Sequence, residues 1–197
     1  MTHFLKVTEI IFIYLSVTLI VYIFSHFSGI CRSYDGFILL ACMFLPVVIW
    51  EKAIKKIPLK ETGLSMPEDF IFELITAILL LLIIICYNFL LPRTSPVNNL
   101  SFILSIPFIL TCFLTSLSEE TFYRGLLLRK IVTVTGKLPG ALIISIVFAF
   151  IGHRGAEVTE NLIWRFPVSL ILSYLYLRKN NLFMAVTVHF ILNVLFS

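Results

Sequence analysis

Long apolar runs separated by short polar stretches occupy nearly the whole chain. A helix needs about 20 apolar residues to cross the hydrocarbon core of a bilayer. The runs that approach this length predict seven membrane helices, at residues 4–27, 36–50, 70–91, 108–128, 140–153, 162–177 and 182–197. A further apolar stretch, 97–107, stops at Pro107 and is a candidate for an extra short or re-entrant helix. The pattern therefore predicts seven or eight membrane helices.

The apolar runs are continuous, without the alternation of period two that strands show, so strands are not expected. Of the 197 residues, 59% are hydrophobic and only 13% are charged, and the mean hydropathy is +1.03. A soluble domain would need far more polar surface. We predict an all-α, polytopic transmembrane helix bundle that forms a single domain over residues 1–197. Residues 1–96 supply its N-terminal helices, and 97–197 form a core with a buried polar site.

The charged residues fit a membrane topology rather than a nucleic-acid partner. The net charge of +4 comes from basic residues in short connections, and an excess of Lys and Arg marks the cytoplasmic side. With the N-terminus inside and seven spans, the cytoplasmic side holds ten of them: Lys6, Lys52, Lys55, Lys56, Lys60, Arg129, Lys130, Lys137, Arg178 and Lys179. The external side holds Arg32, Arg93, Arg154 and Arg165. The sequence therefore predicts a multi-pass protein of the cell membrane with a cytoplasmic N-terminus and an external C-terminus.

Three of the apolar segments carry polar groups that point to chemistry: Glu119, Glu120, Arg124, His153, His189 and Asn193. An ionisable group inside a span is unfavourable, and by default it indicates function. On a helix, Glu120 and Arg124 are neighbours one turn apart and can form an ion pair. Glu119 points about 100° away from Glu120, so it remains free for another role.

The depths of these groups indicate one shared site. Counted at 1.5 Å per residue from the predicted inner boundary of each segment, Glu119 lies ~15 Å deep, His153 ~20 Å and His189 ~12 Å. The hydrocarbon core is about 30 Å thick. Three independent segments thus place polar groups at a similar level, as a single intramembrane site requires.

The residue types suit hydrolysis of an amide bond. A carboxylate and a histidine can hold and deprotonate a water molecule, and His189 with Asn193, one turn apart, can donate hydrogen bonds to an oxyanion. A zinc ion bound by His153, His189 and Glu119 is the alternative. The chain has no HExxH motif, and an asparagine beside His189 suits an oxyanion donor better than a ligand. A site without metal or other cofactor is therefore favoured.

The stretches "EETFYRG" (119–125) and "HFILN" (189–193), with a histidine between them, resemble the motifs of one family. This is the CPBP family of CAAX prenyl endopeptidases and bacteriocin-processing or immunity proteins, also called the ABI family. Its EExxxR motif is matched by Glu119, Glu120 and Arg124, and its HxxxN motif by His189 and Asn193. The resemblance covers roughly residues 100–197.

The resemblance implies a glutamate-dependent intramembrane endopeptidase with defined residue roles. Glu119 and His153 would activate the water, His189 and Asn193 would form the oxyanion site, and Glu120 and Arg124 would support the arrangement. The family's FxxxH motif is not matched in register, because Ala149 stands four residues before His153, between Phe148 and Phe150. In place of family glycines, Ser169 and Ser173 have a spacing that lets helices pack closely.

Two other functions fit the same residues. A bacteriocin self-immunity protein on this scaffold would need little or no catalysis, and a proton-relay transporter would use Glu119, His153 and His189 to move protons. The expected partners are a membrane peptide or protein substrate and the lipid bilayer, with no nucleic acid. The sequence assigns neither an oligomeric state nor a prenyl group on the substrate.

The asymmetry of basic residues generates a topological prediction. A reporter fused after Lys60 should read cytoplasmic and one fused at Ser197 external, because positively charged connections stay inside. Paired alkaline phosphatase and fluorescent-protein fusions measure the two positions. Both reporters on the same side would contradict the seven-span arrangement.

Overall fold

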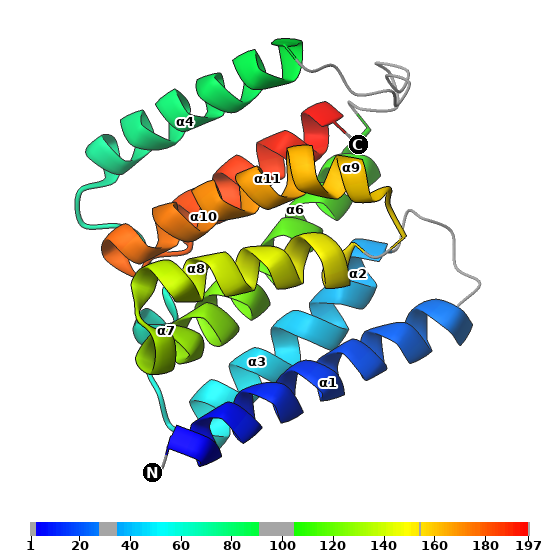
Figure 1. The fold of residues 1–197 in the computed structure, drawn as a ribbon, viewed down its shortest axis with the longest axis vertical. Coiled ribbons are helices and arrows are strands. Elements are labelled where there is room, and N and C mark those ends of the chain that lie inside the picture. Colours follow the sequence, from blue (N-terminus) through cyan, green and yellow to red (C-terminus); the bar gives the residue numbers. More distant parts are fainter. Residues whose placement is uncertain (1–2, 28–34, 91–104, 154, 197) are drawn as a thin grey trace.

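The protein is helical throughout the part that the structure covers. The computed structural model describes residues 3–27, 35–90, 105–153 and 155–196. It is 88% helical, and its described residues form no strand. These residues make seven helical rods, four of which contain π-helical turns (Figure 1). The predicted all-α membrane helix bundle is confirmed.

The bounds of the rods follow the predicted spans closely. The first four are α1 (His3–Phe27); α2 and α3 (Asp35–Leu39 and Leu45–Ile49, joined by Leu40–Phe44 and continued by Trp50–Ile54); α4 (Phe70–Leu90); and α6 and α7 (Ile106–Glu120 and Arg129–Thr135, joined by Thr121–Leu128). The last three are α8 (Lys137–Ile146, continued by Val147–Gly152); α9 and α10 (Val158–Glu160 and Phe166–Lys179, joined by Asn161–Arg165); and α11 (Phe183–Phe196). A short 3₁₀ helix, Leu59–Thr62, precedes α4.

Successive rods run antiparallel, and the two termini lie at opposite ends of the bundle (Figure 1). The N-terminus shares its end with the connection before α4, the α7–α8 turn and the α10–α11 turn. We call this the amino end. Among the described helices, three are long and apolar enough to cross a membrane: Leu5–Ile23, Gly36–Ile54 and Phe70–Tyr87. The apolar helices Lys137–Gly152 and Phe183–Phe196 are shorter.

One predicted boundary was wrong. Residues 97–104 of the proposed extra helix lie outside the described residues, but its last residues, Ile106 and Pro107, form the first turn of α6. Ser105 precedes them in an extended conformation. Proline suits a first helical turn, because its missing N–H would have no partner there in any case. Pro107 therefore lies in the first turn of a helix, whereas the apolar pattern predicts a helix that ends there.

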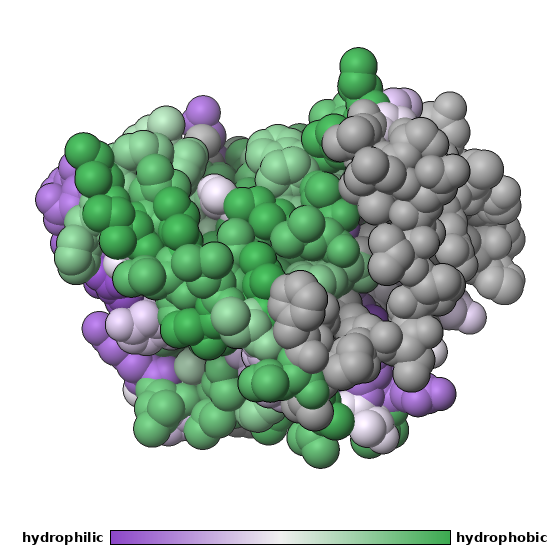
Figure 2. Space-filling model, turned by 90° about the horizontal axis from the view of Figure 1, so that it is seen from above, coloured by the Kyte–Doolittle hydropathy of each residue, from purple (hydrophilic) through white to green (hydrophobic). Residues whose placement is uncertain are grey.

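The outer surface of the bundle is apolar. Large exposed side chains line α1 and α4, among them Phe12, Leu15, Leu19, Ile71, Leu79 and Ile83. Figure 2 shows a broad hydrophobic face with hydrophilic residues at its left edge and at its lower right. At the amino end, ion pairs join neighbouring rods, such as Arg178 with Glu73 at 3.3 Å. An apolar girdle with charges at the helix ends is the surface that a bilayer requires.

The connection before α4 is tied to the α10–α11 turn by backbone geometry. Gly63 has a positive φ of 91°, and its carbonyl accepts a hydrogen bond from the Leu182 N–H at 2.9 Å. The Asn181 side chain donates to the Ser65 carbonyl at 2.7 Å and accepts from the Phe183 N–H at 2.8 Å, which caps the start of α11. This turn fixes where α11 begins, and so sets the level of the residues along it.

Gly63→Ala should destabilise the fold more than Gly136→Ala. Both glycines have a φ near +90°, so each substitution strains the backbone by about 1–3 kcal/mol. A Cβ on Gly63 would also lie 2.9 Å from the Asn180 carbonyl oxygen, whereas one on Gly136 would meet nothing within 4 Å. Thermal unfolding in detergent measures the difference. Equal losses would show that the tie to the α10–α11 turn is not tightly packed.

Candidate functional site

Arg124 is the centre of a buried polar cluster between α6, α8, α10 and α11. Its side chain is fully buried. Nη1 donates to Glu120 Oε1 at 2.9 Å, and Nη2 donates to the hydroxyl and the carbonyl of Ser169 at 2.6 and 3.2 Å. The guanidinium also lies over the Phe148 ring, 4.7 Å from its centroid. The ion pair expected from the spacing of Glu120 and Arg124 is present, and Ser169 adds a second anchor from α10.

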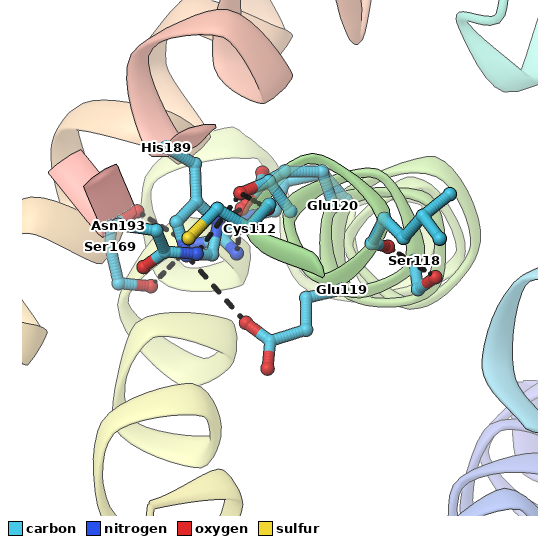
Figure 3. Close-up of polar contacts among 10 residues, drawn as sticks. Cys112, Ser118, Glu119, Glu120, Ser169, His189 and Asn193 are labelled. Carbon is cyan, nitrogen blue, oxygen red and sulfur yellow. Dashed lines mark hydrogen bonds and ion pairs between the residues drawn. The ribbon is translucent and has the colours of Figure 1, made fainter. Parts of the chain in front are cut away.

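His189 lies between the two adjacent glutamates (Figure 3). Its Nδ1 is 2.8 Å from Glu120 Oε1, and its Nε2 is 3.7 Å from Glu119 Oε2. A neutral imidazole that donates its Nδ1–H to Glu120 carries a free lone pair on Nε2. Glu120 thus fixes both the orientation and the tautomer of the ring. The ring nitrogen that remains available for chemistry, Nε2, points towards Glu119.

Glu119 and His153 line one cavity of about 160 Å³. Glu119 comes from the C-terminal turn of α6, and His153 directly follows the π-helical turn after α8. The other wall belongs to the N-terminal helices: Tyr14, Val17, Thr18, Val21 and Tyr22 of α1, with Leu39 and Met43 of the α2 rod. A water molecule occupies about 30 Å³ in the liquid, so the cavity has room for several waters or for part of a substrate.

The π-helical turn explains why the sequence misses the FxxxH register by one residue. Phe148, five residues before His153, packs against it with ring centroids 4.9 Å apart. Residues 147–152 form the π-helical turn, in which neighbours along one face are five residues apart rather than four. Phe148 also lies 5.9 Å from the His189 ring. Phe148 therefore packs where the FxxxH spacing predicts a phenylalanine, and its ring contacts both histidines.

Asn193 lies next to the cluster and donates one of its two amide hydrogens to a side chain of α6. Its Nδ2 donates to the Ser116 hydroxyl at 3.0 Å, and that hydroxyl donates to the Cys112 carbonyl at 2.8 Å. Asn193 is not among the residues that line the cavity of Glu119 and His153. Its predicted part in an oxyanion site, together with His189, stays a prediction.

The sequence alone gives no sign that Ser116, Phe148, Ser169 or the α1 face belongs to the site. Ser169 was noted for its size, and it is indeed fully buried, but its hydroxyl also accepts from Arg124. Within the described part of the chain, no group of three or more His, Cys, Asp or Glu side chains is arranged to hold a metal ion. Glu119, His153 and His189 accordingly form no such group.

The fold and the cluster together define a membrane helix bundle with a buried Glu–His–Arg site. Residues 101–195 match the family model described as "Type II CAAX prenyl endopeptidase Rce1-like". The matching segment contains all six predicted site residues, and the match confirms the predicted CPBP resemblance. Comparison with curated proteins and with solved structures finds no match.

Glu120→Gln and Arg124→Gln should each destabilise the protein strongly, because each leaves its partner charge buried and unpaired. Removing one member of a buried pair typically lowers the free energy of unfolding by about 3–5 kcal/mol. The double substitution should be milder than the sum of the two singles. A double-mutant cycle on thermal unfolding in detergent measures the coupling.

Arg165 and Glu160 provide the matched control pair. Their charged atoms are also 2.9 Å apart, but their side chains are 24% and 32% exposed. The coupling energy of such a pair should stay below about 1 kcal/mol. Additive losses at Glu120 and Arg124 would contradict the role of this pair in holding the four helices together.

Proposed function

We propose that the protein is an intramembrane endopeptidase that cleaves a membrane-associated peptide or protein with water activated by Glu119 and His153. The Rce1-like family is one of CAAX-type endopeptidases. The observation that carries the proposal is the position of Glu119: its carboxylate lines a cavity with one histidine and lies 3.7 Å from a second. Glu120, one residue further on, is held by Arg124 and is not free for this role.

The reaction follows from what each group can hold. A water molecule between Glu119 and His153 loses a proton to the Glu119 carboxylate as its oxygen attacks the scissile carbonyl carbon. The carbonyl electrons move to oxygen and form an oxyanion. When the C–N bond breaks, the proton on Glu119 passes to the leaving nitrogen. The net result is the addition of one water molecule across the peptide bond.

His189 and Asn193 are proposed for the oxyanion side, as the family resemblance implies. His189 can donate from Nε2 only when its ring is protonated, because Nδ1 is already engaged by Glu120. Asn193 donates one of its two amide hydrogens to Ser116, and the other remains available for a substrate. The oxyanion role therefore requires a proton on His189 Nε2, whereas Asn193 can keep its bond to Ser116.

Cleavage can be tested with purified protein in detergent. One probe is an internally quenched peptide that ends in a farnesylated Cys-aliphatic-aliphatic-X sequence. The second is the same peptide without the farnesyl group, and the third is an apolar single-span peptide. Cleavage of any of them supports the proposed function and indicates the substrate class. An immunity protein without catalysis, or a proton relay, would leave all three intact.

Glu119→Gln should lower kcat by roughly 10²–10⁴-fold, since the amide keeps the shape of the side chain but cannot accept the proton of water. The fold should be nearly unchanged, because the Glu119 side chain is 14% exposed and is not part of the Arg124 ion pair. Cleavage rates and thermal unfolding measure the two effects.

Glu68→Gln is the matched control, because its side chain is 88% exposed at the amino end and lines no part of the cavity. It should retain wild-type kcat. Full activity in Glu119→Gln would exclude this carboxylate as the base that activates the water.

A further inference from the structure

A third side chain from the segment that matches the family model carries a polar group at this cavity. Tyr123 lies one turn after Glu119, in the π-helical segment Thr121–Leu128, and it lines the same cavity as Glu119 and His153. The residue is only 6% exposed, and its ring packs edge-on against Phe148, with centroids 5.1 Å apart. The ring is therefore held firmly, and its position sets where the hydroxyl points.

Gly152 leaves the space that the Tyr123 hydroxyl occupies. A Cβ built on Gly152 would lie 2.7 Å from this hydroxyl oxygen, closer than non-bonded atoms approach. Gly152 does not have a positive φ, so its backbone conformation alone does not require glycine. The need comes from the tyrosine. Since Gly152 immediately precedes His153, the hydroxyl lies beside the backbone that carries the histidine.

The Tyr123 hydroxyl has no hydrogen-bond partner among the described residues. Two hydroxyls of α6 are used within the protein, since Ser116 donates to the Cys112 carbonyl and Ser118 to the Leu114 carbonyl, whereas the buried hydroxyls of Thr121 and Tyr176 have no partner in the described part of the chain and do not line this cavity. A phenol group this deeply buried usually has a partner, because an unpaired polar group is unfavourable in an apolar medium. A side chain that is buried, rigid and unpaired, and that faces the cavity of Glu119, is placed to bind a group that enters from outside.

We propose that Tyr123 is a catalytic hydrogen-bond donor to the carbonyl oxygen of the scissile peptide. This inference rests on the proposed endopeptidase function. As the water oxygen attacks, the carbonyl electron pair moves to oxygen, and the Tyr123 O–H donates to the resulting oxyanion while keeping its own proton. A phenol has an ordinary pKa of about 10, so it is a donor at neutral pH without a change of protonation. Unlike His189, whose Nε2 must first gain a proton, Tyr123 can donate as it stands.

Tyr123→Phe tests this role, because it removes the hydroxyl and keeps the ring packing. Loss of one donor to an oxyanion typically lowers kcat by about 10²–10³-fold. KM and the thermal unfolding temperature should stay near wild type, since the interaction forms in the transition state rather than in the resting protein. The pH profile of kcat should keep its shape, because no group that exchanges a proton is lost.

Tyr176→Phe is the matched control. Tyr176 is also fully buried and its hydroxyl also lacks a partner, but it does not line the cavity. It should keep wild-type kcat. A similar fall of kcat in both variants would mean that loss of a buried hydroxyl acts through general packing, and it would overturn the inference.

Gly152→Ala gives a second, independent measurement. In the wild type, the added methyl displaces the Tyr123 hydroxyl and should lower kcat. In the Tyr123→Phe background, the same change should have a much smaller effect, because the displaced oxygen is gone. Additive effects of the two substitutions would contradict the geometry on which the proposal stands.

A readout without turnover separates this inference from the proposed function. The probe is the farnesylated peptide with its scissile amide replaced by a ¹³C-labelled ketone, bound to the Glu119→Gln protein. A hydrogen bond from Tyr123 lowers the ketone stretching frequency, and Tyr123→Phe should raise it again. If the wild-type protein cleaves the peptide, but Tyr123→Phe keeps full kcat and leaves the ketone stretching frequency unchanged, the inference alone is overturned. Absence of both binding and cleavage would overturn the proposed function and this inference with it.

Discussion

The rest of the site depends on the need to neutralise one buried cation. Arg124 is fully buried in a helix bundle with an apolar exterior, where an unpaired charge is strongly unfavourable. It is neutralised by Glu120 from its own helix, and its second nitrogen is bound by Ser169 from α10. Glu120 in turn binds His189 from α11. Three rods are thus fixed at one level by a single chain of polar contacts, and Phe148 after α8 covers the guanidinium.

This constraint gives two adjacent glutamates different environments. Side chains of consecutive helical residues point about 100° apart, so the helix that turns Glu120 towards Arg124 turns Glu119 away from it. Glu120 binds Arg124 and fixes the ring of His189. Glu119 faces the cavity with His153 and meets the other ring nitrogen of His189. A carboxylate that is close to the supporting cluster, yet not part of its ion pair, can exchange protons without unfolding the site.

The cavity itself is completed by helices outside the segment that matches the family. Residues 101–195 supply Glu119, Tyr123 and His153, but α1 and the α2 rod supply the opposite wall. The α1 helix is held at the amino end by Glu9, whose carboxylate lies 3.1 Å from Lys55 and from Lys130. The shape of the space beside the candidate base therefore depends on the N-terminal half of the chain.

The sequence by itself determined the helical class, the approximate ends of the rods, and the pairing of Glu120 with Arg124. Continuous apolar runs exclude other folds in lipid, and a contact one turn apart lies within a single helix. Equal depth also indicated that Glu119, His153 and His189 belong together. Only the tertiary structure decided that His189 binds Glu120, that Asn193 binds Ser116, and that Tyr123 reaches the cavity. These contacts depend on how each helix is rotated about its axis. In a membrane, a helix that is apolar on every side carries little signal of which face packs inward. Its rotation about its axis is therefore set by the packing of neighbouring rods, which the sequence does not reveal.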